Sequence, residues 1–195
     1  MRRFHAWYCT TEKFPHPRYN SARTRSTCGE VELSIVNNVT RLLDLRKIPY
    51  SAYEFSPEKR GAQETARLLD TDPASIFKTI VVLRDKPKKP LLVLVSGDSV
   101  VDLKLLASAL GEKKVYLPTE KEAEQITGLQ AGGISPLALL NKGFQVILDS
   151  SAENFEQIHV SGGQRGLNIK LPVTDLIKLT NARVESAGRQ GNAKE

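Results

Sequence analysis

The sequence has few of the side chains on which most catalytic centres depend. It has two cysteines and three histidines, and among these only His159 lies beyond residue 30. A cysteine nucleophile or a histidine-rich metal centre in the rest of the chain is therefore excluded. The chain also has no Walker phosphate loop and no dinucleotide fingerprint. An enzyme of this composition has to rely on lysine, hydroxyl, carboxylate or backbone amide groups.

The positions of the few cysteines and histidines narrow the class further. Cys9 and Cys28 both fall in the N-terminal stretch, which argues against a disulfide scaffold and favours a reducing, cytoplasmic setting. Together with His5 and His16 they match no zinc pattern with paired, closely spaced ligands. His159 alternates with apolar neighbours in a strand-like run, which is more typical of a packing or surface histidine than of a general base.

Long apolar runs are missing as well. No segment approaches the roughly 18 apolar residues of a membrane helix, so we expect a soluble protein without membrane contact. The length of 195 residues and the apolar fraction of 40% indicate one globular domain. The net charge of +6 weakly favours an anionic partner, but the N-terminal stretch 1–30 holds +4 of it and leaves +2 for the rest.

The two ends of the chain differ from its middle in patterning. Residues 1–33 show no helical or strand period, and they lack the apolar region of a secretory signal. They fit a mobile tail, an arginine- and serine-rich targeting peptide, or upstream sequence added by a wrong start site; we favour a disordered or spurious extension. The folded domain is predicted over residues 34–186, and residues 187–195 are predicted to be a disordered C-terminal tail.

The middle of the chain alternates between helical and strand periods. Helices are predicted from 36 to before 49, over 62–69, 102–110 and 172–179, after a capping box at Thr119 and Glu122, and as a short turn at 72–73. Strands are predicted over 50–55, 79–83, 91–95, 115–117, 145–148, 157–160 and 167–171 and near 184. This order predicts a single α+β domain with a mixed, partly barrel-like sheet flanked by helices.

A lysine interrupts the first long apolar run. Lys78 shares a strand face with Ile80 and Val82 in the period-two pattern. Because a buried, unpaired ammonium is costly, this lysine has to be paired, desolvated or at the mouth of the strand. The alternative is an edge lysine that keeps its ammonium group in water.

Two glycine-rich segments follow. In the first, Gly132 and Gly133 precede Ser135-Pro136, which is typical of an N-cap with proline at the first helical position. Its N–H groups suit a carbonyl oxygen or a phosphate, although a plain loop leading into a helix fits the pattern too. The second segment, residues 161–167, fits a phosphate-binding turn with Arg165 as the anion clamp or a glycine-rich hairpin equally well.

Four motifs occur together in an order that resembles the YbaK family of aminoacyl-tRNA deacylases. They are Phe-Lys-Thr at 77–79, Asp-Leu-Lys with Leu-Gly at 102–111, Gly-Gly-Ile-Ser-Pro at 132–136 and Ser-Gly-Gly-Gln-Arg-Gly-Leu at 161–167. The likeness runs from about residue 36 to residue 184. This family is similar to the editing domain of bacterial prolyl-tRNA synthetases and uses no metal or other cofactor.

The resemblance implies roles for particular residues. Lys78 matches the key lysine, which binds the substrate end and stabilises developing negative charge, and Gly132 and Gly133 match the loop whose amides hold the substrate carbonyl. The substrate-binding residues implied in addition are Tyr53, Thr79, Ser135, Ser161, Arg165 and Asn168. Asn168 departs from the family, which typically has an aspartate there, so a salt bridge or proton-accepting role at this position is in doubt.

The function implied by the resemblance is hydrolysis of mischarged aminoacyl-tRNA, most characteristically Cys-tRNA(Pro). The attacking group is then water or, for cysteine, the thiol of the substrate in a lyase-type release. Deacylation of Ala-tRNA(Pro) or of another amino acid is the alternative within this class. A non-catalytic module that binds tRNA or a synthetase is the alternative outside it. The implied partners are the tRNA(Pro) 3′ end and prolyl-tRNA synthetase.

Overall fold

The computed structural model describes residues 18–20, 35–85 and 88–191. The predicted N-terminal extension over 1–33 lies outside these residues except for β1 (Arg18–Asn20), which pairs antiparallel with β2 (Ser51–Glu54). No helix in the described ranges is both long and apolar enough to cross a membrane.

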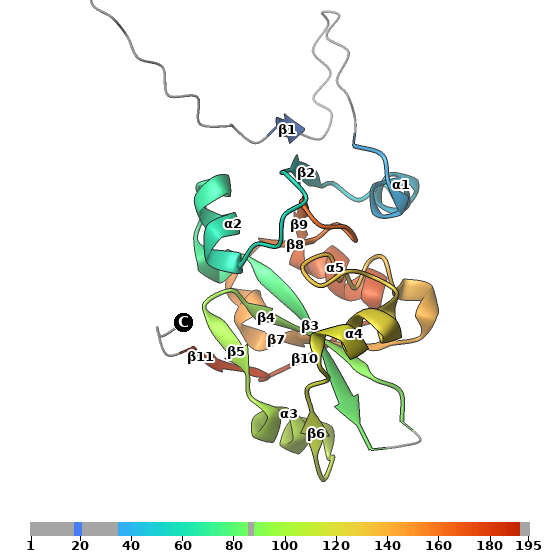
Figure 1. Ribbon diagram of the computed structural model, residues 1–195. Coiled ribbons are helices and arrows are strands. Elements are labelled where there is room, and N and C mark those ends of the chain that lie inside the picture. The colour runs from blue at the N-terminus through green and yellow to red at the C-terminus, as the bar shows by residue number, and fades with distance from the viewer. Residues whose placement is uncertain (1–17, 21–34, 86–87, 192–195) are drawn as a thin grey trace, which may run out of the picture.

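The strands form three sheets (Figure 1). The four-stranded sheet is antiparallel and has the order β1-β2-β9-β8, with β9 at Leu167–Pro172 and β8 at Gln157–Ser161. The five-stranded sheet is mixed and has the order β10-β7-β4-β3-β6; its strands are Arg183–Glu185, Gln145–Asp149, Leu91–Ser96, Phe77–Arg84 and Val115–Tyr116. The ribbon of β11 (Gly188–Gln190) and β5 (Ser99–Val101) completes the set.

The central strand β4 explains why its sequence is apolar without alternation. Both of its faces are covered, so all six of its residues are buried. Leu92 and Leu94 face the larger core, which α5 (Val173–Thr180) and the four-stranded sheet also line. Val93 and Val95 face a smaller core beneath α3 (Leu103–Leu110).

The helices begin and end where local signals place them. In α1 (Asn38–Leu45), Asn37 caps the N-terminus, and α2 (Ala62–Leu69) ends in a left-handed residue. α3 ends at Gly111 in the left-handed conformation, and the predicted capping box precedes α4 (Glu120–Thr127). Three short 3₁₀ helices, Pro73–Ser75, Leu140–Lys142 and Ser150–Asn154, connect other elements. The α+β class, the 79–83/91–95 hairpin and the helices at 62–69 and 102–110 are thus confirmed.

Three features differ from expectation. The strands in the described ranges form open sheets and no closed barrel. Ser135 caps no helix, because residues 136–139 form only a turn before the 3₁₀ helix. Residues 188–190, predicted to belong to a disordered tail, form β11. The reason is the carboxylate of Asp149, which accepts hydrogen bonds from the N–H groups of Ala187 (2.8 Å) and Gly188 (2.7 Å) and brings the chain alongside β5.

Candidate active site

A pocket of about 190 Å³ lies where the two large sheets meet. Ile76, just before β3, forms a parallel bridge with His159 of β8, which brings the start of β3 against the four-stranded sheet. The walls are the start of β3, the loop before Ser135, the glycine-rich turn after β8 and residues 55–65. Of the predicted site residues, the structure brings five to this pocket: Lys78, Thr79, Gly132, Ser161 and Asn168.

Lys78 is half-buried in the pocket wall. Its ammonium group donates to the carbonyl of Gly97 at 3.4 Å, a long hydrogen bond that leaves most of its bonding capacity for a ligand. Burial lowers the pKa of Lys78 below its ordinary value of 10.5, and the nearby carboxylate of Asp98 opposes this effect. The residue is therefore a cation poised in a partly desolvated site rather than an edge lysine with its ammonium group in water.

The loop before Ser135 supplies backbone donors, although not the pair that the sequence suggested. Gly132 lines the pocket with φ +84°, a conformation that favours glycine. The N–H of Gly133 is occupied, because it donates to the carbonyl of Gln130 at 2.8 Å. In the part of the chain that the structure describes, the N–H groups of Gly132 and Ile134 donate to no other residue, and both residues line the pocket.

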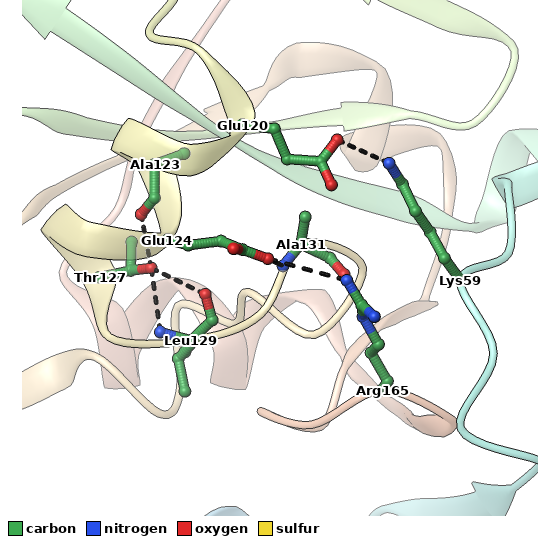
Figure 2. Close-up of polar contacts among 8 residues, drawn as sticks. All are labelled: Lys59, Glu120, Ala123, Glu124, Thr127, Leu129, Ala131 and Arg165. Carbon is green, nitrogen blue, oxygen red and sulfur yellow. Dashed lines mark hydrogen bonds and ion pairs between the residues drawn. The ribbon is translucent and has the colours of Figure 1, made fainter.

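Arg165 ties this loop to the glycine-rich turn (Figure 2). Its Nε donates to the carbonyl of Ala131 at 2.7 Å, and its Nη2 lies 3.7 Å from Oε1 of Glu124. The same carboxylate oxygen accepts the N–H of Ala131 at 2.8 Å. The carbonyl of Ala131 is therefore bonded to Arg165, and its N–H is bonded to Glu124. Arg165 is not among the pocket-lining residues, and its guanidinium braces the loop. The anion clamp, one of two interpretations of this segment, stays a prediction.

Gly133 shows why the loop and the turn lie in direct contact. A Cβ at this position would come within 2.8 Å of the backbone N of Arg165 and of the carbonyl carbon of Gln164. Real Cβ atoms essentially never approach backbone so closely, which accounts for glycine here. The turn is anchored on its other side too, since Nδ2 of Asn37 donates to the carbonyl of Gly162 at 2.8 Å. The position of the turn is therefore fixed from α1 as well as from the loop.

Asn168 lies between the pocket and a buried histidine. Its Oδ1 is 2.8 Å from Nδ1 of His159, and both residues are buried. Burial lowers the pKa of His159 to about 4, so the imidazole is neutral at pH 7. The ring of Tyr53 packs against this imidazole with centroids 5.6 Å apart. Tyr53 supports the histidine and is not among the pocket-lining residues.

In the described part of the chain, no hydroxyl group that lines the pocket is hydrogen-bonded to a general base. Oγ of Ser161 accepts only a long hydrogen bond, 3.4 Å, from the N–H of Gly163. Oγ1 of Thr79 and Oγ of Ser135 are buried and have no partner among the described residues. Thr79 lines the pocket, whereas Ser135 lies behind it. The neutral His159 is bonded to an asparagine, so a serine–histidine pair is not formed.

Charged residues that sequence reasoning missed complete the pocket. Arg60 and Glu58 line it, and 12% of the Arg60 side chain is exposed. The guanidinium of Arg60 is bonded to both oxygens of Ser56 and lies 2.9 Å from a carboxylate oxygen of Glu58. The neighbouring Lys59 forms an ion pair of 2.6 Å with Glu120 of α4, which Figure 2 also shows. The sequence feature that could have indicated these pocket residues was the dense charge of residues 58–60, but such charge is also common on solvated loops.

The fold and this donor-rich pocket define an aminoacyl-tRNA editing domain: the model of the family described as "Aminoacyl-tRNA editing domain" matches residues 56–179, and the chain belongs to that family. EbsC of Enterococcus faecalis, a protein named for Cys-tRNA(Pro)/Cys-tRNA(Cys) deacylation, is 36% identical over 148 residues, which cover 75% of this chain and 89% of EbsC.

Two further relatives place the same domain in other contexts. The proline–tRNA ligase of Aquifex aeolicus is 27% identical over 106 residues, which are 54% of this chain but only 18% of the ligase. A crystal structure of a protein described as a trans-editing enzyme for prolyl-tRNA synthetase superimposes with a TM-score of 0.67 at 23% identity. The match covers 80% of this chain and 99% of that structure. The last likeness is one of fold.

Proposed function

We propose that this protein is a deacylase that hydrolyses the ester between a small, wrongly attached amino acid and the 3′-terminal ribose of tRNA. Cysteine on tRNA(Pro) is the proposed substrate, in keeping with the name of the relative EbsC. The observation that carries the proposal is the partly desolvated ammonium of Lys78 in a pocket that also offers free backbone N–H groups. We place the reaction in the cytoplasm, with prolyl-tRNA synthetase as a partner.

The need for such an enzyme has a physical origin. A synthetase pocket discriminates poorly between ligands of similar size, because one methylene is worth only about 1–3 kcal/mol. A second site that hydrolyses the wrong product corrects the error. Such a site requires stabilisation of the negative charge that develops on the carbonyl oxygen when the ester is attacked.

The pocket offers donors of two kinds for that charge. The N–H groups of Gly132 and Ile134 have no acceptor among the described residues, and the ammonium of Lys78 supplies a positive charge. Because the site is partly desolvated, each donor acts in a lower dielectric than water and stabilises the oxyanion more strongly. Removing one donor of this kind costs about 100-fold to 1,000-fold in rate.

The attacking group comes from outside the protein. The described residues around the pocket include hydroxyls but no cysteine, and no hydroxyl is paired with a base. Water is one nucleophile. For a cysteinyl ester the substrate thiol is the other: its sulfur attacks the carbonyl carbon, the bond to the ribose oxygen breaks, and that oxygen takes up the thiol proton. The resulting cyclic thioester is then hydrolysed by water to cysteine.

The test compares Cys-tRNA(Pro) deacylation by the wild type and by Lys78→Met, which removes the ammonium and keeps the apolar stem. We expect a loss of about 100-fold or more. The control Lys114→Met, at an exposed position just before β6, should retain full activity. Hydrolysis of Ala-tRNA(Pro) instead would keep the oxyanion stabilisation, leave water as the nucleophile and reassign the substrate. Binding of tRNA without turnover of any ester, weakening uniformly with salt, would refute the enzymatic function.

A further inference from the structure

The hydrogen bond between Asn168 and His159 determines which group of the asparagine faces the pocket. Asn168 is on β9 and His159 is on the neighbouring β8. The 2.8 Å contact joins Oδ1 of the amide to Nδ1 of the ring, and both residues are buried. An amide has its acceptor and its donor on opposite branches. With Oδ1 turned to the histidine, Nδ2 is turned away from it.

The surroundings of His159 favour its neutral form. The ring contacts Tyr53 of β2 and Asn168 of β9, and the nearby charge is the positive Lys170. Among the described residues, no carboxylate contributes to the shift of its pKa. A neutral imidazole facing an amide oxygen through Nδ1 carries its proton on Nδ1 and donates it. The histidine therefore acts as a fixed donor that orients the amide.

The amide nitrogen of Asn168 opens into the pocket. Asn168 lines the pocket, and its Nδ2 has no partner among the described residues. Among the described residues, the side-chain polar atoms that are shielded from solvent and have no hydrogen-bond partner belong to Arg60, Thr79 and Ser135. Nδ2 of Asn168 is not one of them. Nδ2 is therefore both accessible and unoccupied. Its N–H groups add to the ammonium of Lys78 and the N–H of Gly132, whose residues line the same pocket.

We propose that His159 is a positioning residue: it fixes the orientation of the Asn168 amide, so that the side-chain N–H groups of this expected substrate-binding residue donate to an oxygen of the aminoacylated ribose. The proposal rests on the proposed deacylase function. It also assigns selectivity: a donor cannot accept a hydrogen bond from an ammonium, so the α-ammonium of the amino acid is bound elsewhere. A carboxylate at position 168 would reverse this preference.

The orientation can be tested without any substrate. The ¹⁵N chemical shifts of the His159 ring identify the protonated nitrogen, and the signal is assigned by its loss in His159→Gln. We expect the proton on Nδ1 in the full-length protein at pH 7. A proton on Nε2 alone would mean that Nδ1 accepts from the amide, which would turn Oδ1 to the pocket and overturn the proposal. Since this result needs no turnover, it is independent of the deacylase assignment.

Activity tests the role of the oriented amide. Asn168→Asp keeps the shape and replaces the donor by an acceptor, so we expect kcat/KM for Cys-tRNA(Pro) to fall at least 10-fold. The matched control Asn154→Asp makes the same change at an exposed position and should leave it unaltered. His159→Phe should raise KM for Cys-tRNA(Pro). His159→Gln can still donate to Oδ1 of Asn168, so its KM should stay close to that of the wild type.

Two results would count against this role. Asn168→Asp as active as the wild type would refute substrate binding by the N–H groups. His159→Gln as impaired as His159→Phe, with both variants folded, would refute positioning by a donated hydrogen bond. If the wild type itself turned over no ester, the proposed function would fail while the ring-nitrogen measurement still decided the orientation.

Discussion

The brace formed by Arg165 offers a quantitative test of how the pocket is built. Replacing Arg165 by methionine keeps most of the apolar stem and removes the Nε donor to the carbonyl of Ala131, 2.7 Å away. A hydrogen bond from a charged donor contributes about 1.5–3 kcal/mol. The side chain is 27% exposed, so water can replace the donor in part, and the lower half of that range applies.

This loss of free energy converts into an expected fall in the deacylation rate. A loss of about 1.5–2 kcal/mol from the conformation that presents Gly132 corresponds to a fall of about 10-fold to 30-fold, since each 1.36 kcal/mol is tenfold. The assay is single-turnover deacylation of Cys-tRNA(Pro) at saturating enzyme, which reports the chemical step. Unfolding by urea, measured in parallel, separates a displaced loop from an unfolded protein.

Two companion variants make the test specific. Glu124→Gln keeps an oxygen that can accept the N–H of Ala131 and removes only the charge. The 3.7 Å ion pair with Arg165 is partly exposed and contributes about 0.2–1 kcal/mol, so activity should stay within about 5-fold of the wild type. Arg183→Met removes the exposed ion pair with Glu185 on β10 and should change nothing. A folded Arg165→Met variant with wild-type single-turnover rates would refute the brace.

Three further perturbations follow from the pKa values and the close contacts. Activity should fall as the pH rises through the lowered pKa of Lys78; Asp98→Asn removes the charge that raises this pKa, so the alkaline limb of the pH–rate profile should move to lower pH. His159 has its pKa lowered from 6.5 to about 4, so the unfolded chain binds its proton first as the pH falls. The free energy of unfolding should therefore drop by about 3 kcal/mol between pH 7 and pH 4, and His159→Gln should flatten this dependence in urea titrations. Gly133→Ala places a Cβ 2.8 Å from the backbone of the glycine-rich turn and should cost about 1–3 kcal/mol together with most of the activity, whereas Gly61→Ala, with no atom within 4 Å, should be nearly neutral in both assays.

The elements that could be predicted from the sequence are those governed by neighbouring residues. The capping box at Thr119 and Glu122 and the left-handed Gly111 are interactions within one helix turn, and both occur as predicted. The apolar runs at 79–83 and 91–95 pair across a polar loop as expected. Ser135 is the exception among local signals. Its Ser-Pro pattern is compatible with a helix start, but residues 136–139 form only a turn and no α-helix follows Ser135.

Which residues line the site depends on contacts between segments that are distant in the sequence. Arg60 and Glu58 enter the pocket because the loop after β2 folds over the start of β3, a placement that no local period encodes. The same holds for Arg165, whose partner Ala131 is 34 residues away, and for Asp149, which draws in residues 187 and 188. Charge alone suggested an anion clamp at Arg165, and the geometry shows its brace to Ala131.

The sequence indicates the two glycine-rich segments through residue type and spacing, which limit the local backbone conformation. The class of domain and the candidate role of Lys78 came from the resemblance of four motifs to a known family. The tertiary structure sets which donors are free. The N–H of Gly133 is consumed by its own turn, while those of Gly132 and Ile134 are left unoccupied among the described residues. It likewise decided that Asn168 turns its oxygen to His159, because the partner of a buried polar group is set by packing between strands.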